Sequence, residues 1–330
     1  MVDKLSREEI LNAQEIYLYD DYLYILPNIE GTVYKLHPDL SWGTRENGSF
    51  WHVWDCDPSL FVPMSGVKAL ELIDKWKMKI KEDNDRLSKA IIFATEKHNG
   101  QFRKATTIPY IMHPLEVLQI LHSMKADTNL MIAGVLHDTI EDTDTTSDEI
   151  KQLFGDDVAA LVASHSEDKS KTWKERKEHT IKELAVASNR VKMLVLADKL
   201  SNIRSIAKDY NQFGNELWKR FNAPKEKQAW YYSNIQDALV NMQSLYACKE
   251  AYWEFVALFK DVFVKFYIDE ERKTLYQICE DLNEGYYLEK GNPCWKLILP
   301  EKRNILPETA IQIARKEAEN IEDYWNEEIL

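Results

Sequence analysis

Residues 134–143 read GVLHDTIEDT and place four ionisable side chains in a segment that is otherwise largely apolar. His137 and Glu141 are four residues apart, and so are Asp138 and Asp142. A helix would therefore present all four side chains on adjacent lines of one side. Burying an imidazole and a carboxylate is costly unless they are paired or bound to a metal. The stretch predicts a helical domain built around a polar site.

Two other segments carry the same types of residue. Residues 111–114 read IMHP and contain His113, while residues 197–202 read ADKLSN, with Asp198 and Asn202 one helical turn apart. Two imidazoles and two carboxylates make up the predicted site: His113, His137, Asp138 and Asp198. This mixed set of nitrogen and oxygen ligands suits a divalent ion such as Mn²⁺, Fe²⁺ or Zn²⁺. Such an ion lowers the pKa of bound water and shields phosphate charge, and the acidic pair of the first stretch would then move protons.

The composition argues against several other classes of protein. Glycine accounts for only 10 of the 330 residues, and neither GxGxxG nor GxxxxGK[ST] occurs, which argues against Rossmann and P-loop folds. With 42 Lys and Arg against 55 Asp and Glu, the formal charge is −13, which disfavours binding of DNA or RNA. No apolar run approaches the ~20 residues of a membrane span. The charged start of the chain and four cysteines without CxxC spacing predict a cytoplasmic protein.

The predicted fold class is mainly α, with three regions of different character. Residues 1–75 are rich in aromatic residues and contain short alternating runs, which predict a small β-containing module of unknown function. Residues 76–248 show helical periodicity and should form the bundle that holds the site. Residues 249–330 read as a helix, a stretch with glycine and proline, and a charged helix, which predicts an α-rich C-terminal extension.

Several motifs occur in the order found in a known family. Residues 98–114 read HNGQFRKATTIPYIMHP, residues 137–146 read HDTIEDTDTT, and residues 197–205 read ADKLSNIRS. They resemble the HxGQxRK…PYIxHP, HDxxEDT and ADRLxNxRT motifs of the RelA/SpoT-type alarmone hydrolases, and in particular the small hydrolases of that group. The resemblance covers residues 85–246, about half of the chain.

The resemblance implies an all-helical HD domain that uses Mn²⁺ to hydrolyse the 3′-diphosphate of (p)ppGpp, giving GDP or GTP and pyrophosphate. Carried over by motif, the metal ligands are His113, His137, Asp138 and Asp198, and the catalytic acidic pair is Glu141 and Asp142. The residues that match substrate-binding positions are Arg103, Lys104, Asn202 and Lys169. Of these, Arg103 and Asn202 are implied to flank the guanine.

The sequence also departs from the family pattern. Residues 105–108 lack the usual glycine, and residues 162–166, VASHS, replace a stretch of apolar residues and threonine that is more typical of the family. We expect His165, within that stretch, to have a surface or packing role. Neither flank resembles a synthetase domain, so the sequence predicts degradation of the alarmone without its synthesis.

Two alternatives stay open at this point. The same metal site could act on another nucleotide, such as NADPH or an adenine alarmone, because Arg103 and Asn202 could stack on any purine. The chain could instead be an antitoxin-like partner of a toxic alarmone synthetase, with the flanking regions binding that protein. A purely binding role has no chemical need for all six ligand and acid–base positions, which favours an enzyme with a small-molecule nucleotide substrate.

Overall fold

The computed structural model describes most of the chain as two compact units, residues 1–88 and 89–330. The residues that it describes are 5–27, 33–45, 60–166, 170–292, 294–298, 306–307 and 309–327. The mainly α class is confirmed, whereas the three-region boundaries drawn from the sequence stay a prediction.

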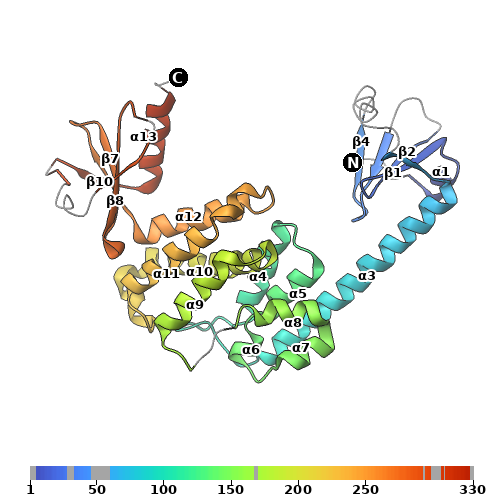
Figure 1. Ribbon diagram of the computed structural model, residues 1–330, viewed down its shortest axis with the longest axis horizontal. Helices are drawn as coiled ribbons and strands as arrows, with labels where there is room; N and C mark the ends of the chain where they lie inside the picture. Colours follow the sequence, from blue (N-terminus) through green and yellow to red (C-terminus); the bar gives the residue numbers. More distant parts are fainter. Residues whose placement is uncertain are drawn as a thin grey trace. The chain divides into compact units, whose positions relative to one another are not determined.

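The first unit contains the expected β-containing module (Figure 1). Its elements are α1 (Arg7–Leu11), β1 (Glu15–Tyr19), β2 (Tyr22–Leu26), β3 (Val33–Leu36), β4 (Trp42–Arg45), β5 (Val62–Pro63) and the first part of α3 (Gly66–Lys97). The strands form an antiparallel sheet in the order β4-β3-β2-β1-β5. Leu23 and Ile25 of β2 are fully buried and belong to one core with Ala69 and Ile73 of α3. The alternating apolar residues of β2 thus pack against the helix that follows the sheet.

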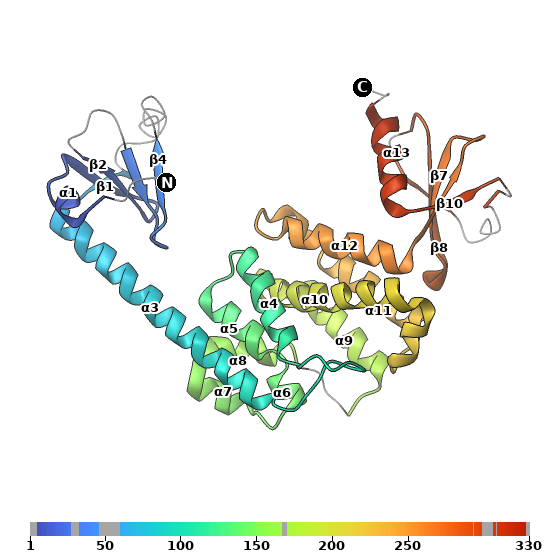
Figure 2. The same ribbon diagram turned by 180° about the vertical axis from the view of Figure 1, so that it is seen from behind.

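The second unit begins with a helical bundle (Figures 1 and 2). Its helices are α4 (Met112–Ser123), α5 (Thr128–Leu136), α6 (Thr139–Asp142), α7 (Ser147–Phe154), α8 (Asp156–Ala163), α9 (Trp173–Val186), α10 (Asn189–Phe213), α11 (Lys225–Ala238) and α12 (Lys249–Phe263). The short helices η2 (Gly214–Arg220) and η3 (Val240–Ser244) connect the later ones. α10 packs against α4, α5 and α12. At the contact of α4 with α5, a Cβ on Gly134 would overlap the Leu121 Cδ1 methyl group, so glycine lets the two helices approach without a shift of that side chain.

Residues 134–143, which the sequence predicts to be helical, do not form one continuous helix. α5 ends at Leu136 and α6 begins at Thr139, with His137 and Asp138 between them. The Thr139 hydroxyl donates to the Leu136 carbonyl at 2.6 Å, and His137 Nδ1 lies 2.8 Å from the Gly134 carbonyl oxygen. These side chains compete with the backbone for helical hydrogen bonds, which accounts for the break.

The C-terminal part of the second unit holds a second sheet (Figure 1). Its elements are β6 (Lys265–Asp269), β7 (Thr274–Cys279), η4 (Glu280–Leu282), β8 (Glu284–Glu289), β9 (Lys296–Leu297), β10 (Ile311–Ile313) and α13 (Arg315–Glu327). The antiparallel order is β10-β6-β7-β8-β9. Phe266, Leu275 and Leu288 of the sheet share a core with Ala318 and Trp325 of α13. The helices expected in this extension are present as α12 and α13, but the sheet between them is not part of the sequence prediction.

Among the residues described, no helix combines the length and the apolar character needed to cross a membrane.

Candidate metal centre and its pocket

The four predicted metal ligands converge in the helical bundle. His113 lies in the first turn of α4, His137 and Asp138 lie between α5 and α6, and Asp198 lies in the middle of α10. His113 Nε2 is 3.2 Å from Asp198 Oδ1, and His137 Nε2 is 2.9 Å from Asp138 Oδ2. The ligand atoms of His113, His137 and Asp198 lie within 4.8 Å of one another, and all three residues are buried.

Hydrogen bonds on the far side of each imidazole fix which nitrogen faces the cluster. His113 Nδ1 is 2.8 Å from Ser201 Oγ, and that hydroxyl donates to Glu116 Oε2 at 2.8 Å. Since the hydroxyl proton is used on Glu116, His113 Nδ1–H must donate to Ser201, which leaves a lone pair on Nε2. His137 Nδ1 likewise donates to the Gly134 carbonyl oxygen at 2.8 Å. In neutral rings, both Nε2 lone pairs point toward carboxylates.

This arrangement fits a divalent cation. Within the described part of the chain, buried His137 Nε2 has no assigned hydrogen bond, although Asp138 Oδ2 lies only 2.9 Å away. With ligand bonds of about 2.0–2.2 Å, neighbouring donor atoms around one ion are about 3 Å apart. The separations of 2.9 and 3.2 Å between imidazole and carboxylate atoms match that spacing.

The negative charge of the buried carboxylates also favours a positive charge within the cluster. Burial disfavours a charged His137, but Asp138 and Asp198 outweigh this effect and raise the pKa of His137 to about 9. Burial lowers the pKa of His113. The pKa of Asp198 lies well below its usual range because the Lys199 ammonium and neighbouring histidines outweigh the effect of burial. A divalent cation binding here would displace the proton on His137, since ligands bind in their deprotonated form.

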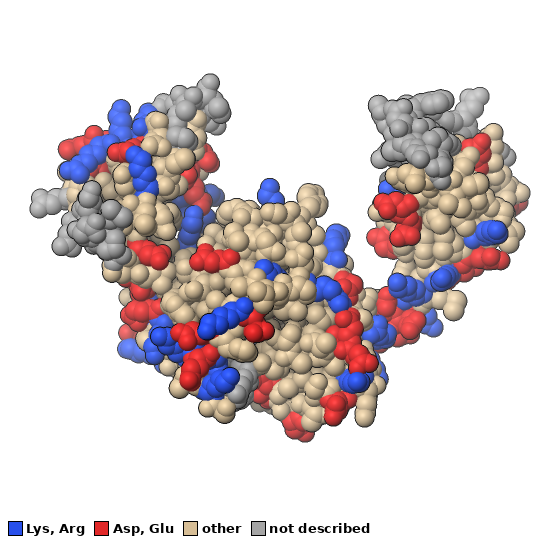
Figure 3. Space-filling view, viewed as in Figure 1, with Lys and Arg blue, Asp and Glu red and all other residues tan. Residues whose placement is uncertain are grey.

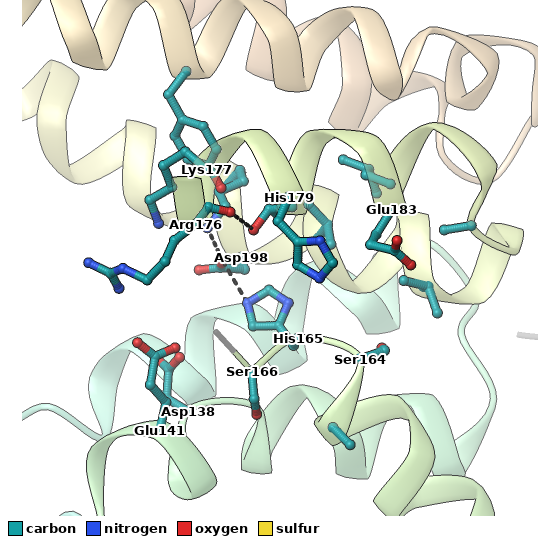
Figure 4. A pocket seen from close by; sticks show the side chains of 18 of the residues that line it. Asp138, Glu141, Ser164, His165, Ser166, Arg176, Lys177, His179, Glu183 and Asp198 are labelled. Carbon is teal, nitrogen blue, oxygen red and sulfur yellow. Dashed lines mark hydrogen bonds and ion pairs between the residues drawn. The ribbon is translucent and has the colours of Figure 1, made fainter. Parts of the chain in front are cut away.

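A cavity of about 600 Å³ opens onto the cluster (Figure 4). Asp138 and Glu141 lie on one side of it, and Arg176 and Lys177 project from α9 on the other side. Lys171 and Lys199 also line it. The cavity therefore combines an acidic cluster with basic side chains on an otherwise acidic protein.

The two members of the predicted acidic pair lie in different surroundings. Glu141 lines the cavity and is partly buried, whereas Asp142 is exposed and is not among the lining residues. Tyr110 Oη donates to Asp138 Oδ2 at 2.6 Å and lies 3.4 Å from Asp142 Oδ2. Burial and the neighbouring carboxylates raise the pKa of Tyr110, so its phenol stays protonated as a donor.

The predicted substrate-binding residues are divided between two cavities. Asn202 donates to Asp198 Oδ1 at 2.6 Å and accepts a hydrogen bond from Arg103 at 3.3 Å. Lys104 donates to Asn222 Oδ1 at 3.0 Å, and with Arg103 it lines a second cavity of about 220 Å³. Asn202 and Tyr110 line both cavities. Lys169 lies outside the described residues.

Comparisons with known proteins decide the family. Residues 90–224 match the family model described as HD domain. The guanosine-3′,5′-bis(diphosphate) 3′-pyrophosphohydrolase MESH1 of Danio rerio is 39% identical over 135 residues, which cover 40% of this chain and 73% of that protein. This chain belongs to the RelA/SpoT-type HD-domain hydrolase family. The family predicted from the motifs is thereby confirmed.

This HD-domain hydrolase matches only a small part of the length of some longer relatives. A guanosine-3′,5′-bis(diphosphate) 3′-pyrophosphohydrolase of Aquifex aeolicus is 33% identical over 198 residues, which cover 58% of this chain and 27% of that protein. A GTP pyrophosphokinase of Myxococcus xanthus is 37% identical over 133 residues, covering 38% of this chain and 17% of that protein. The chain thus spans about a quarter or less of these two relatives.

One residue of the HD-domain hydrolase site was missed by the sequence analysis. His165 follows α8, and its Nε2 lies 3.0 Å from Asp198 Oδ2. A surface role is therefore wrong, because the side chain is only 10% exposed and contacts Asp198, whereas the packing role stays a prediction. No spacing signal marks this histidine, because it lies in a turn 33 residues before Asp198. The departure of residues 162–166 from the family stretch is the one sequence feature that points to it.

Proposed function

We propose that this chain hydrolyses the 3′-diphosphate of ppGpp and pppGpp, releasing pyrophosphate and leaving GDP or GTP. The observation that carries the proposal is the convergence of two histidines and two aspartates beside a cavity lined by basic side chains. Two of the relatives compared above are named for this activity. Because the chain spans only part of the longer relatives, the activity is a proposal for this protein.

The cofactor that we propose is one Mn²⁺ ion, held by His113, His137, Asp138 and Asp198. A divalent ion at this site would lower the pKa of a bound water and offset negative charge on the phosphates. Imidazole and carboxylate together suit Mn²⁺ better than Mg²⁺, which prefers oxygen ligands. The Ser201 and Gly134 contacts would hold both imidazoles with Nε2 toward the ion.

In this proposal the protein moves the proton through its acidic side chains. Glu141 lines the cavity beside Asp138, so its carboxylate is the best-placed group to accept a proton from the attacking water. Asp142, the second member of the proposed pair, would act from the exposed side, where Tyr110 lies between it and Asp138.

The proposed substrate contacts use charge and planar groups. Arg103 and Asn202 would flank the guanine, Lys104 would lie near the phosphates, and Lys169 is proposed as a further substrate-binding residue. Arg176 and Lys177 face the cavity from α9 and supply the positive charge that a polyanionic substrate requires. Basic side chains gathered in one cavity allow an acidic protein to bind such a substrate.

The experiment that tests this function compares substrates directly. Metal-loaded protein is incubated with ppGpp, pppGpp, pppApp and NADPH, and the products are identified by chromatography. We expect pyrophosphate release from ppGpp and pppGpp. A His113→Gln variant should lose turnover, whereas His122→Gln on the exposed face of the same helix should keep it. Turnover of NADPH or pppApp alone would move the proposal to that nucleotide.

We propose further that the chain has no synthetase activity, acts in the cytoplasm and does not bind nucleic acid. The face drawn in Figure 3 supports the last point, because Lys and Arg are interspersed with Asp and Glu rather than gathered in a broad basic surface. We propose residues 1–75 and 249–330 as modules outside the chemistry that could bind a protein partner, and residues 76–248 as the hydrolase domain. A truncated protein starting near Ala69 should keep the metal and some turnover, which would support placing residues 1–75 outside the chemistry.

A further inference from the structure

His165 adds a third imidazole to the cluster. Its ring lies between α8 and α9 and points toward Asp198, as Figure 4 shows. A nitrogen of His165 lies within 4.8 Å of the ligand atoms of His137 and Asp138, which makes a second group of potential metal ligands. The His137 and His165 ring centres are 5.1 Å apart. His165 is therefore part of the same polar space as the four predicted ligands.

The two groups of ligands can serve only one ion. They share His137, and the Nδ1 of that residue is already used by the Gly134 carbonyl oxygen. A single remaining nitrogen, Nε2, can bind a single cation. We propose that His165 is a third imidazole ligand of this centre, so that three histidines and two aspartates surround one ion. This inference rests on the metal centre of the proposed function.

A role limited to orienting Asp198 accounts less well for the position of His165. Asp198 Oδ2 already accepts from Lys199 Nζ at 2.7 Å, and Oδ1 accepts from Asn202 at 2.6 Å. The carboxylate is thus held at both oxygens without His165. Without an ion, His165 Nε2 and Asp198 Oδ2 share a hydrogen bond of 3.0 Å, a third contact on a carboxylate that is already held. The same separation is the spacing expected of two neighbouring ligands of one ion, so a cation could replace the shared proton without moving either side chain.

The local backbone holds His165 in place. The His165 amide donates to the Val162 carbonyl at 3.1 Å, and the Ser164 hydroxyl donates to the Leu161 carbonyl at 2.7 Å. The His165 side chain is only 10% exposed. Its position at the end of α8 is therefore set before any ion binds, as a ligand requires.

The consequence is a change in metal selectivity. Imidazole nitrogen favours Zn²⁺ and other later metals, whereas Mn²⁺ is served well by carboxylate oxygen. A third imidazole should raise the affinity for Zn²⁺ more than the affinity for Mn²⁺. We expect this centre to bind Zn²⁺ more tightly, relative to Mn²⁺, than the same centre without His165.

The test measures the dissociation constants of Zn²⁺ and Mn²⁺ for the full chain by competition with a chromogenic chelator. His165→Val should weaken Zn²⁺ binding by about tenfold or more, with a smaller effect on Mn²⁺. The visible absorption of the Co²⁺-loaded protein should also change, because the number of ligands falls. His179→Val is the matched control, since His179 lines the same cavity outside both ligand groups. It should leave both affinities unchanged.

Three outcomes would overturn the inference. Equal weakening of Zn²⁺ and Mn²⁺ binding, with the Co²⁺ spectrum unchanged, would mean that His165 only positions Asp198. No change in either affinity would mean that His165 has no part in the centre. A native protein that binds neither metal would overturn both this inference and the proposed centre. Tight binding of metal without turnover of ppGpp would overturn the proposed function alone. If His165→Val does not fold, His165→Gln answers the same question.

Discussion

Two clusters of charge on helix α10 differ in burial and in pairing. Near the start of the helix, Arg190 lies 2.7 Å from Asp157 and 3.0 Å from Asp127, and all three side chains are partly exposed. In the middle of the helix, Asp198 is buried with Lys199 and three histidines around it. The first cluster is an arginine fork between two carboxylates that joins α10 to the starts of α5 and α8. The second packs several polar groups into the bundle and leaves His137 Nε2 without a hydrogen bond among the described residues.

The difference in burial separates a cluster that stabilises the fold from a cluster that is suited to binding a ligand. Exposed ion pairs contribute about 0–1 kcal/mol each, so the Arg190 cluster is a modest structural link. Buried carboxylates cost more than their pairing returns unless the geometry is excellent. A chain that retains such a buried cluster, with histidine nitrogens facing carboxylates, is better explained by ligand binding than by stability.

The largest expected effect is on turnover. Glu141→Gln should lower kcat by about 10²- to 10⁴-fold with KM little changed, because it removes a basic group and keeps the shape of the side chain. Metal content should stay at the native level. Near-native turnover of Glu141→Gln would mean that Asp142, and not Glu141, transfers the proton. Loss of metal comparable to that of Asp138→Asn would make Glu141 a ligand.

The next effect is on stability in the presence of metal. Mn²⁺ at about 100 times its dissociation constant should raise the free energy of unfolding by about 2.7 kcal/mol. Asp138→Asn should lose most of this increment at the same Mn²⁺ concentration, because it weakens the metal centre. Arg190→Met should keep it. Thermal unfolding with Mn²⁺ and with excess chelator measures this increment. An equal loss of the increment in both variants would contradict the assignment of the metal to the Asp198 cluster alone.

A smaller effect is expected on stability without metal. Arg190→Met should lower the free energy of unfolding by about 1 kcal/mol, since the pairs it removes are partly exposed and screened. Urea unfolding at pH 7 measures this difference. A loss several times larger would mean that the link between α5, α8 and α10 is a major stabilising element.

The smallest expected effect is the pH dependence of the stabilisation by the Arg190–Asp157 ion pair. Hydrogen bonds from Arg190, and then from Asn129, lower the pKa of Asp157 to about 2. A lowered pKa in the folded state means that the stabilisation is complete above the unfolded value of about 3.9 and is lost as pH falls through about 2. The stability difference between native protein and Arg190→Met should therefore shrink between pH 4 and about 2. A difference that stays constant across that range would contradict the assignment.

Local sequence determined much of this protein. The four predicted ligands lie in motifs whose order resembles that of a known family, and the resemblance implied that they form one site. Thr146 accepts from the Glu149 amide at the start of α7, and Gly155 ends this helix with a φ of 97°. Threonine before a helix and glycine after it are local signals that can be read from a sequence. Helices are specified by neighbours three and four residues apart, which a single sequence displays directly.

Tertiary structure alone decided the rest. The C-terminal sheet pairs β10 with β6 across more than 40 residues, and no short-range pattern specifies that pairing. His165 lies in a turn, so only the packing of α8 against the bundle brings it to Asp198. The Ser201 and Glu116 contacts that orient His113 likewise join α10 to α4. Such contacts depend on how distant segments pack, and that information is not contained in the spacing of residues along one helix.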